Sequence, residues 1–284
     1  MAAHFSLNLA LVHGQVTPIW PPTGIALAAL VVLGRRVWPS IAVAAFVVNL
    51  PIGPSPLGAA LIAAGNTLAP LAAAELLARA GFRVKLDRLR DALTLIALGA
   101  LTGMTISATV GTSVLYVSGT IPPSSFLGTW AVWWTGDAMG VLLVAPFLFC
   151  LLPRPGTRAP DWRRQIELGV LLALVGVVTY FLFQNPFRLE YLVLPLIMVA
   201  AWRFHLRGAA PAALIASVVA VWAAVNGSGP FATEALLAKM ITLQAFNVSV
   251  SLASFVLALF VETHEQKLEL SRRYESAKLA IAAK

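Results

Sequence analysis

The sequence is short of charge. Asp, Glu, Lys and Arg together make up 11% of the chain, whereas soluble domains contain about 25% charged residues. Hydrophobic residues make up 59% of the chain, and long apolar runs recur from one end to the other. This composition indicates a membrane protein. No run stands alone at the start before a small-residue cleavage site, so we expect no removable signal peptide.

Cysteine pairs, metal-ligand clusters and enzyme motifs are also missing. The single cysteine, Cys150, has no partner in the chain for a disulfide. The histidines are scattered without ligand spacing, at His4, His13, His205 and His264. The patterns G-x-x-x-x-G-K-[ST], H-E-x-x-H and G-x-S-x-G do not occur. We therefore expect no metal, no cofactor and no catalysis by this chain.

The basic residues do not indicate nucleic-acid binding. The formal net charge is +8, but the positive side chains fall in short clusters between apolar runs. Such clusters set the orientation of membrane helices, because cytoplasmic loops are rich in Lys and Arg. The polar segment 262–284 is too charged to enter lipid, and we place it in the cytoplasm. Alternate loops then lie on the same side of the membrane and contain Arg35, Arg36, Arg79, Arg83, Lys85, Arg88, Arg90, Arg154, Arg158, Arg163, Arg164, Arg203 and Arg207. We expect a multi-pass protein of the bacterial inner membrane with a cytoplasmic C-terminus.

The apolar runs predict an all-α, polytopic transmembrane bundle of about eight to ten helices. Several runs are shorter than the ~20 residues that a perpendicular helix needs, so we expect some helices to be short, tilted, broken or re-entrant. Residues 1–261 would form the membrane domain, and residues 262–284 a cytoplasmic linker helix. The candidate passes are 3–14, 18–34, 37–50, 57–80, 91–117, 126–152, 165–184, 189–204, 208–226 and 235–261.

The stretch "VWWTGDAMGVLLVAPF" places one acid, Asp137, in the middle of a candidate pass. At about 100° per residue, Trp130, Trp133 and Trp134 share its helix face. A charged group at the bilayer centre costs about 2.5–3.5 kcal/mol on insertion scales, so such a residue is a functional candidate. Asp137 is protonated, or held by neighbours such as Asn66, Asn247 or Gln244, or paired with something outside the protein. The alternative is that it joins two helices while the tryptophans fill space.

Two further polar sets lie within apolar runs. Asn66 follows Gly65 and precedes Pro70, which removes a backbone donor and predicts a polar kink. Along the last pass, Gln244, Asn247, Ser251 and Ser254 share one face and lead toward the polar tail. Such groups also serve as hydrogen-bonding glue between helices. These four residues are our candidates for signal transmission.

The two ends of the chain carry further signals. Pro21 and Pro22 follow Trp20 and predict a fixed helix start, placed at the outer surface, while Gly24 would allow a close helix approach. In the tail, apolar residues repeat at spacings of four, three and four, at Leu270, Tyr274, Ala277 and Ile281. This spacing favours a coiled-coil seam and a homodimer. A frayed amphipathic tail is the alternative.

Several motifs, in this order and spacing, resemble the first family of bacterial membrane-associated sensor (MASE) domains. They are "WPPTGIALAALVVLGRRVWP", "AFVVNL", "AAGNTLAPLAAAELL", "MTISATVGTSVL" and "TWAVWWTGDAMGVLLVAPFL". The resemblance covers the chain to about Val261. It implies a sensory membrane module fused to a cytoplasmic histidine kinase, diguanylate cyclase, phosphodiesterase, PAS or GAF domain. The matching positions are Trp20, Pro21, Pro22, Gly24, Asn49, Gly65, Asn66, Trp134, Gly136, Asp137, Gly140 and Pro146.

The leading hypothesis is a sensory input module for a histidine kinase or a cyclic-di-GMP enzyme. Its partners would be the lipid bilayer, a second copy of the chain and a small-molecule ligand or membrane protein. The candidates for ligand binding or signal sensing are Asp137, Trp134, Trp133, Trp130, Asn66 and Trp20. A proton- or cation-coupled transporter or channel is one alternative, because membrane acids among broken helices serve ion coupling. A passive membrane anchor that dimerises an effector is the other.

Overall fold

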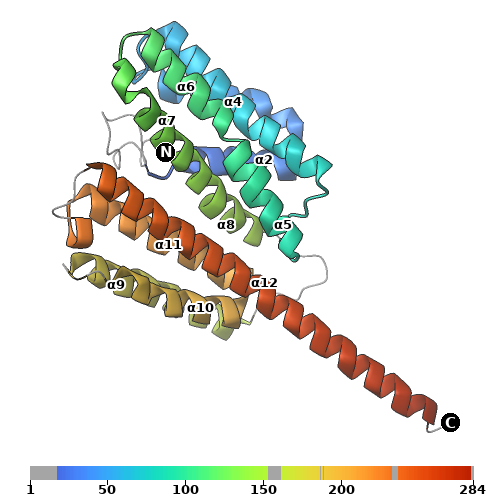
Figure 1. Ribbon diagram of the computed structural model, residues 1–284. Coiled ribbons are helices and arrows are strands. Elements are labelled where there is room, and N and C mark those ends of the chain that lie inside the picture. Colours follow the sequence, from blue (N-terminus) through green and yellow to red (C-terminus); the bar gives the residue numbers. More distant parts are fainter. Residues whose placement is uncertain (1–17, 153–160, 186, 188, 232–235, 283–284) are drawn as a thin grey trace.

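The structure of the protein is a computed structural model (Figure 1). It describes residues 18–152, 161–185, 187, 189–231 and 236–282. All regular secondary structure in these residues is helical, so the predicted all-α fold is confirmed. The expected first pass at residues 3–14 lies outside the described residues.

The helices divide into long and short elements. The α-helices are α2 (Pro21–Leu33), α3 (Trp38–Asn49), α4 (Pro56–Arg79), α5 (Leu89–Thr94), α6 (Thr105–Val117), α7 (Phe126–Met139), α8 (Ala145–Cys150), α9 (Trp162–Gln184), α10 (Val193–Phe204), α11 (Leu206–Val225) and α12 (Leu236–Ala282). Short 3₁₀ turns are η1 (Arg35–Val37), η3 (Pro123–Ser125), η5 (Glu190–Leu192) and η6 (Gly229–Phe231). The π-helical segments η2 (Leu95–Thr102) and η4 (Gly140–Val144) interrupt two long helices.

Six helical stretches have the length and hydropathy to cross a membrane among the described residues. They are Pro56–Arg79, Leu89–Val117, Pro123–Cys150, Trp162–Gln184, Leu206–Val225 and Ala238–Val261. The helices α2, α3 and α10 are shorter, at 13, 12 and 12 residues. At about 1.5 Å per residue, none of these three spans the ~30 Å hydrocarbon core alone. The protein is a multi-pass membrane protein in which short helices complete the bundle, as expected.

The helices form two groups (Figure 1). The first group contains α2 to α8, in which α4 packs against α2, α3 and α6. The second contains α9 to α12, in which α11 packs against the other three helices. Contacts of α11 with α8 and η4, and of α12 with α5 and α7, join the two groups. The apolar core therefore runs through both groups.

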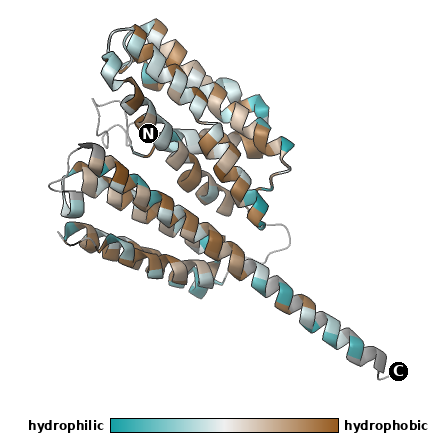
Figure 2. Cartoon of the chain, viewed as in Figure 1, coloured by the Kyte–Doolittle hydropathy of each residue, from teal (hydrophilic) through white to brown (hydrophobic). Residues whose placement is uncertain are grey.

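Helix α12 projects far beyond the other helices. It runs for 47 residues without a break, as expected for a helix that leads from the membrane into a polar tail. Hydrophobic residues dominate its first half, whereas hydrophilic residues appear along its free end (Figure 2). A structural change within the bundle can therefore reach the tail along one continuous helix.

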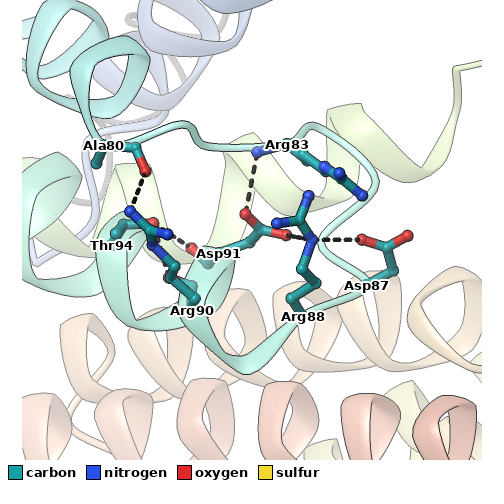
Figure 3. Close-up of polar contacts among 7 residues, drawn as sticks. All are labelled: Ala80, Arg83, Asp87, Arg88, Arg90, Asp91 and Thr94. Atoms are coloured by element: carbon teal, nitrogen blue, oxygen red, sulfur yellow. Dashed lines mark hydrogen bonds and ion pairs between the residues drawn. The ribbon is translucent and has the colours of Figure 1, made fainter.

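A polar cluster orders the loop between α4 and α5 (Figure 3). Asp91 is buried and accepts a hydrogen bond of 3.1 Å from the backbone N–H of Arg83. The Arg88 Nε lies 3.9 Å from Asp91 Oδ2 and 4.0 Å from Asp87 Oδ1. Arg90 donates to the carbonyl of Ala80 at the end of α4. Because α12 contacts α5, this ordered corner lies beside α12.

Candidate functional site

The first turn of α2 lies deep in the first helical group. The backbone N–H of Trp20 donates a 2.9 Å hydrogen bond to the carbonyl of Gly136. Gly136 sits near the middle of the long helical stretch Pro123–Cys150. Pro21 and Pro22 occupy the first helical positions, so the predicted helix start is confirmed. Its expected place at the outer surface is wrong, because hydropathy alone does not reveal how deep a short helix begins.

A glycine contact brings α2 against the long helix. A Cβ added at Gly24 would lie 2.1 Å from the carbonyl oxygen of Gly140, and one added at Gly140 would lie 2.1 Å from the carbonyl oxygen of Trp20. No side chain fits in either place. The close approach expected at Gly24 is therefore confirmed, and it brings the two backbones into direct contact beside Asp137.

Asp137 is fully buried, with 1% of its surface exposed. The Thr23 hydroxyl on α2 donates to its Oδ1 at 2.6 Å, and the Ser107 hydroxyl on α6 donates to its Oδ2. Trp133 is a further polar neighbour of the same carboxyl. The acid thus joins α2, α6 and α7, and the positive end of the α2 dipole lies beside it.

The partners of Asp137 differ from those expected. Asn66, Asn247 and Gln244 make no described hydrogen bond to it, and Thr23 and Ser107 hold it instead. Sequence reasoning missed both hydroxyl residues. Ser107 lies within "TISATVG" and Thr23 within "WPPTG", which were the only signals available.

The tryptophans fasten α7 to the neighbouring long helix. Trp134 Nε1 donates to the carbonyl of Leu101 at 2.8 Å, and Trp130 Nε1 donates to the Thr109 hydroxyl at 3.1 Å. The Trp130 and Trp134 rings stack, with centroids 5.7 Å apart. The Trp133 ring covers Gly111, where an added Cβ would lie 2.4 Å from the indole. The indole N–H groups of Trp130 and Trp134 are therefore satisfied within the protein, and the Trp133 indole lies beside the Asp137 carboxyl.

Asn66 and Trp20 come together at a cavity of ≈ 520 Å³ between α2, α3 and α4. Thr23 also lines this cavity, so its hydroxyl joins the cavity wall to Asp137. The Asn66 Oδ1 atom is buried and has no hydrogen-bond partner among the described residues. The predicted candidates thus form two adjacent parts, a cavity with Asn66 and Trp20 and a sealed contact around Asp137.

The polar stripe of α12 faces inward. Asn247, Ser251 and Ser254 are buried, and Gln244 is half-buried. Gln244 Nε2 donates a 2.9 Å hydrogen bond to the carbonyl of Pro18, two residues before Trp20. Asn247 Nδ2 reaches Gln244 Oε1 at 3.5 Å. Helix α12 is therefore attached to the segment that leads into α2.

The free end of α12 leaves the proposed seam uncovered by this chain. Leu270 is 69% exposed and Tyr274 is 72% exposed. The side chains of Ala277 and Ile281 lie outside the described residues. These large apolar side chains, exposed at the free end of α12, are available to a partner.

Comparison with known proteins identifies one family. The family model MASE1 matches residues 1–265. No curated protein and no solved structure matches the chain.

Proposed function

The chain belongs to the MASE1 family of membrane-associated sensory domains of signalling proteins, and from this premise we propose that it is the input module of a bacterial histidine kinase or cyclic-di-GMP enzyme. The module itself supplies a signal rather than catalysis. It would reside in the inner membrane with the free end of α12 in the cytoplasm, because the basic loops favour that side.

One contact carries the proposal, the hydrogen bond from Gln244 to Pro18. It attaches α12 to the lead-in of α2, which is the segment of residues 18–20 directly before that helix. The first turn of α2 contacts both Asp137 and the cavity. A signal that moves this turn also acts on the start of the output helix. A ligand shifts the output only if it binds two conformations with different affinities. The two positions of the lead-in would be those conformations.

The tail supports a dimeric output. The exposed Leu270 and Tyr274 are one turn apart on the free helix. Pairing with a second copy would bury these side chains in a coiled-coil seam. A tilt or rotation of α12 within each bundle would then reposition two effector domains.

A transporter is the second candidate, and one observation favours it. Short helices that begin beside a buried acid are typical of transporters, where helix ends surround the substrate or coupling ion. In this protein, however, two hydroxyl groups and a glycine contact close around Asp137. This closure favours sensing over ion passage.

The proposal is tested with the chain fused to a diguanylate cyclase domain. Asp137→Asn and Trp134→Ala should change the cyclase output while membrane insertion and dimerisation persist. Thr179→Val is the matched control, because Thr179 is buried but bonds only within its own helix, to Val175. Unchanged output in both test variants would indicate a passive anchor.

The transporter alternative needs a separate measurement. Purified protein in liposomes should show no proton or cation flux above that of empty liposomes. Flux that is abolished by Asp137→Asn would indicate that the chain is a transporter and not a sensor.

A further inference from the structure

The cavity exists because α3 stands away from α2. Helix α3 packs along α4 but hardly touches α2, although η1 connects the two in the chain. Of the residues on α3, only Asn49 is buried. At the η1 end of α3, Arg35 pairs with Glu75 on α4. The space between α2 and α3 therefore results from the packing of α3 on α4 and not on α2.

The size of the cavity suits a small molecule. Its ≈ 520 Å³ lies within the range of about 300–1,000 Å³ typical of ligand sites. Most of the wall is apolar, with the Trp20 indole beside aliphatic side chains. Polar side chains are few and come from separate elements, Thr23 from α2, Ser40 and Asn49 from α3 and Asn66 from α4. A mainly apolar wall with a few convergent polar groups is the usual design of a small-molecule site.

The electrostatics exclude a charged occupant. No charged side chain is among the described residues that line the cavity. Asp137, the nearby acid, lies behind Thr23 and already has two hydroxyl donors. A ligand ion would lose its hydration without gaining a counter-charge, which costs several kcal/mol or more. The occupant is therefore neutral.

Asn66 indicates one polar group that the occupant would carry. Its Oδ1 is buried without a partner, and an unsatisfied buried acceptor costs about 1–3 kcal/mol. The amide of Asn49 already donates to the carbonyl of Ala45 in its own helix. Thr23 is likewise engaged with Asp137. Among the side chains that line the cavity, the buried polar atom without a partner is thus an acceptor, which calls for a hydroxyl or N–H donor.

We propose that the cavity between α2, α3 and α4 binds a small neutral molecule with an apolar body and one hydroxyl or N–H group, which donates to Asn66 Oδ1. This inference rests on the proposed sensory function, because the occupant is the signal that the module detects. Binding would press on Trp20 and Thr23, the two residues that join the cavity to Gly136 and Asp137.

A second groove on the other side of α3 provides the comparison. It has a similar volume of ≈ 500 Å³ and is lined by Trp38, Ala42, Phe46 and side chains of α4. Thr67 carries the only hydroxyl among the described residues that line it, and this hydroxyl already donates to the carbonyl of Ala63. None of the described side chains that line this groove has a buried acceptor without a partner, so the groove suits lipid chains. A comparison of the two sites tests whether binding depends on the Asn66 acceptor or only on an apolar space of this size.

The experiment uses a matched pair of probes and the chain in lipid nanodiscs. The probes are 5-fluoroindole and its N-methyl derivative, which lacks the N–H donor, observed by ¹⁹F NMR. Wild-type protein should bind 5-fluoroindole saturably and the N-methyl probe at least tenfold more weakly. Equal affinity for the two probes, or no saturable binding of either, would overturn the proposal. Equal saturable binding would instead indicate an apolar site for acyl chains.

Variants locate the binding. Asn66→Leu should weaken 5-fluoroindole binding at least tenfold, and Ala45→Phe should abolish it by filling the cavity. Ala42→Phe fills the groove on the other side of α3 and should leave binding unchanged. Binding that survives Ala45→Phe, or is lost only in Ala42→Phe, would contradict the assignment. The comparison of probes on wild-type protein needs no variant to fold.

The outcome remains distinct from that of the proposed function. Binding is measured without an effector, whereas sensing is measured by cyclase output. If Asp137→Asn alters the output but no probe binds, the ligand assignment alone fails. If the probe binds but neither it nor the membrane variants change the output, the sensory function fails.

Discussion

Replacing Thr23 by valine removes one of the two hydroxyl donors to Asp137 with almost no change of shape. Asp137 is 1% exposed, so no water replaces the lost donor at Oδ1. A buried acceptor left unsatisfied costs about 1–3 kcal/mol. An ordinary hydrogen bond between membrane helices contributes about 0.6 kcal/mol. The expected loss in the free energy of unfolding is therefore about 1–3 kcal/mol, above the ordinary value.

The assay is reversible unfolding in mixed micelles, followed by tryptophan fluorescence as the fraction of denaturing detergent rises. Thr179→Val is the control of equal burial, since its hydroxyl bonds only to the carbonyl of Val175. The loss for Thr23→Val should clearly exceed that for Thr179→Val. In an Asp137→Leu background the acceptor is gone, so Thr23→Val should cost much less. Equal costs for Thr23→Val in both backgrounds, no greater than for the control, would refute this account of Asp137.

Three further predictions concern neighbouring contacts. Gly24→Ala places a methyl 2.1 Å from a carbonyl oxygen of η4 and should strongly lower thermal stability, whereas Gly128→Ala, in open space, should be neutral or stabilising by about 0.5–1 kcal/mol; similar melting temperatures would contradict the glycine contact. Trp134→Phe leaves a carbonyl of η2 without its 2.8 Å donor and should cost about 0.5–1.5 kcal/mol on unfolding, and no loss would mean that water replaces the indole. Leu270→Glu combined with Tyr274→Glu should convert a dimer to a monomer in analytical ultracentrifugation, and an unchanged dimer would place the interface elsewhere.

Local patterns in the sequence predicted much of the fold. Apolar runs predict membrane helices because lipid offers no partners to backbone polar groups. The double proline predicts the start of α2, and Gly24 predicts a close approach, since both effects depend on one residue and its own backbone. The burial of Asp137 followed from its place in the middle of an apolar run. These features need no knowledge of distant parts of the chain.

The partners of Asp137 could not be predicted in the same way. Thr23 and Ser107 lie 114 and 30 positions away along the chain. Serine and threonine are common in membrane helices, where they often bond to their own backbone, as Thr67 does. No periodicity marks the hydroxyl that meets an acid on another helix. The bond from Gln244 to Pro18 was equally hidden, because a backbone carbonyl leaves no signature in the sequence.

The central claim is that the contact around Asp137 and the output helix are joined through the lead-in of α2. The most direct test is cyclase output from four forms of the fusion: wild type, Asp137→Asn, Gln244→Met and the double variant. Gln244→Met removes the hydrogen bond to Pro18. We expect Asp137→Asn to change the output in the wild-type background and to have little further effect when Gln244 is replaced. Independent effects that multiply in the double variant would contradict the account.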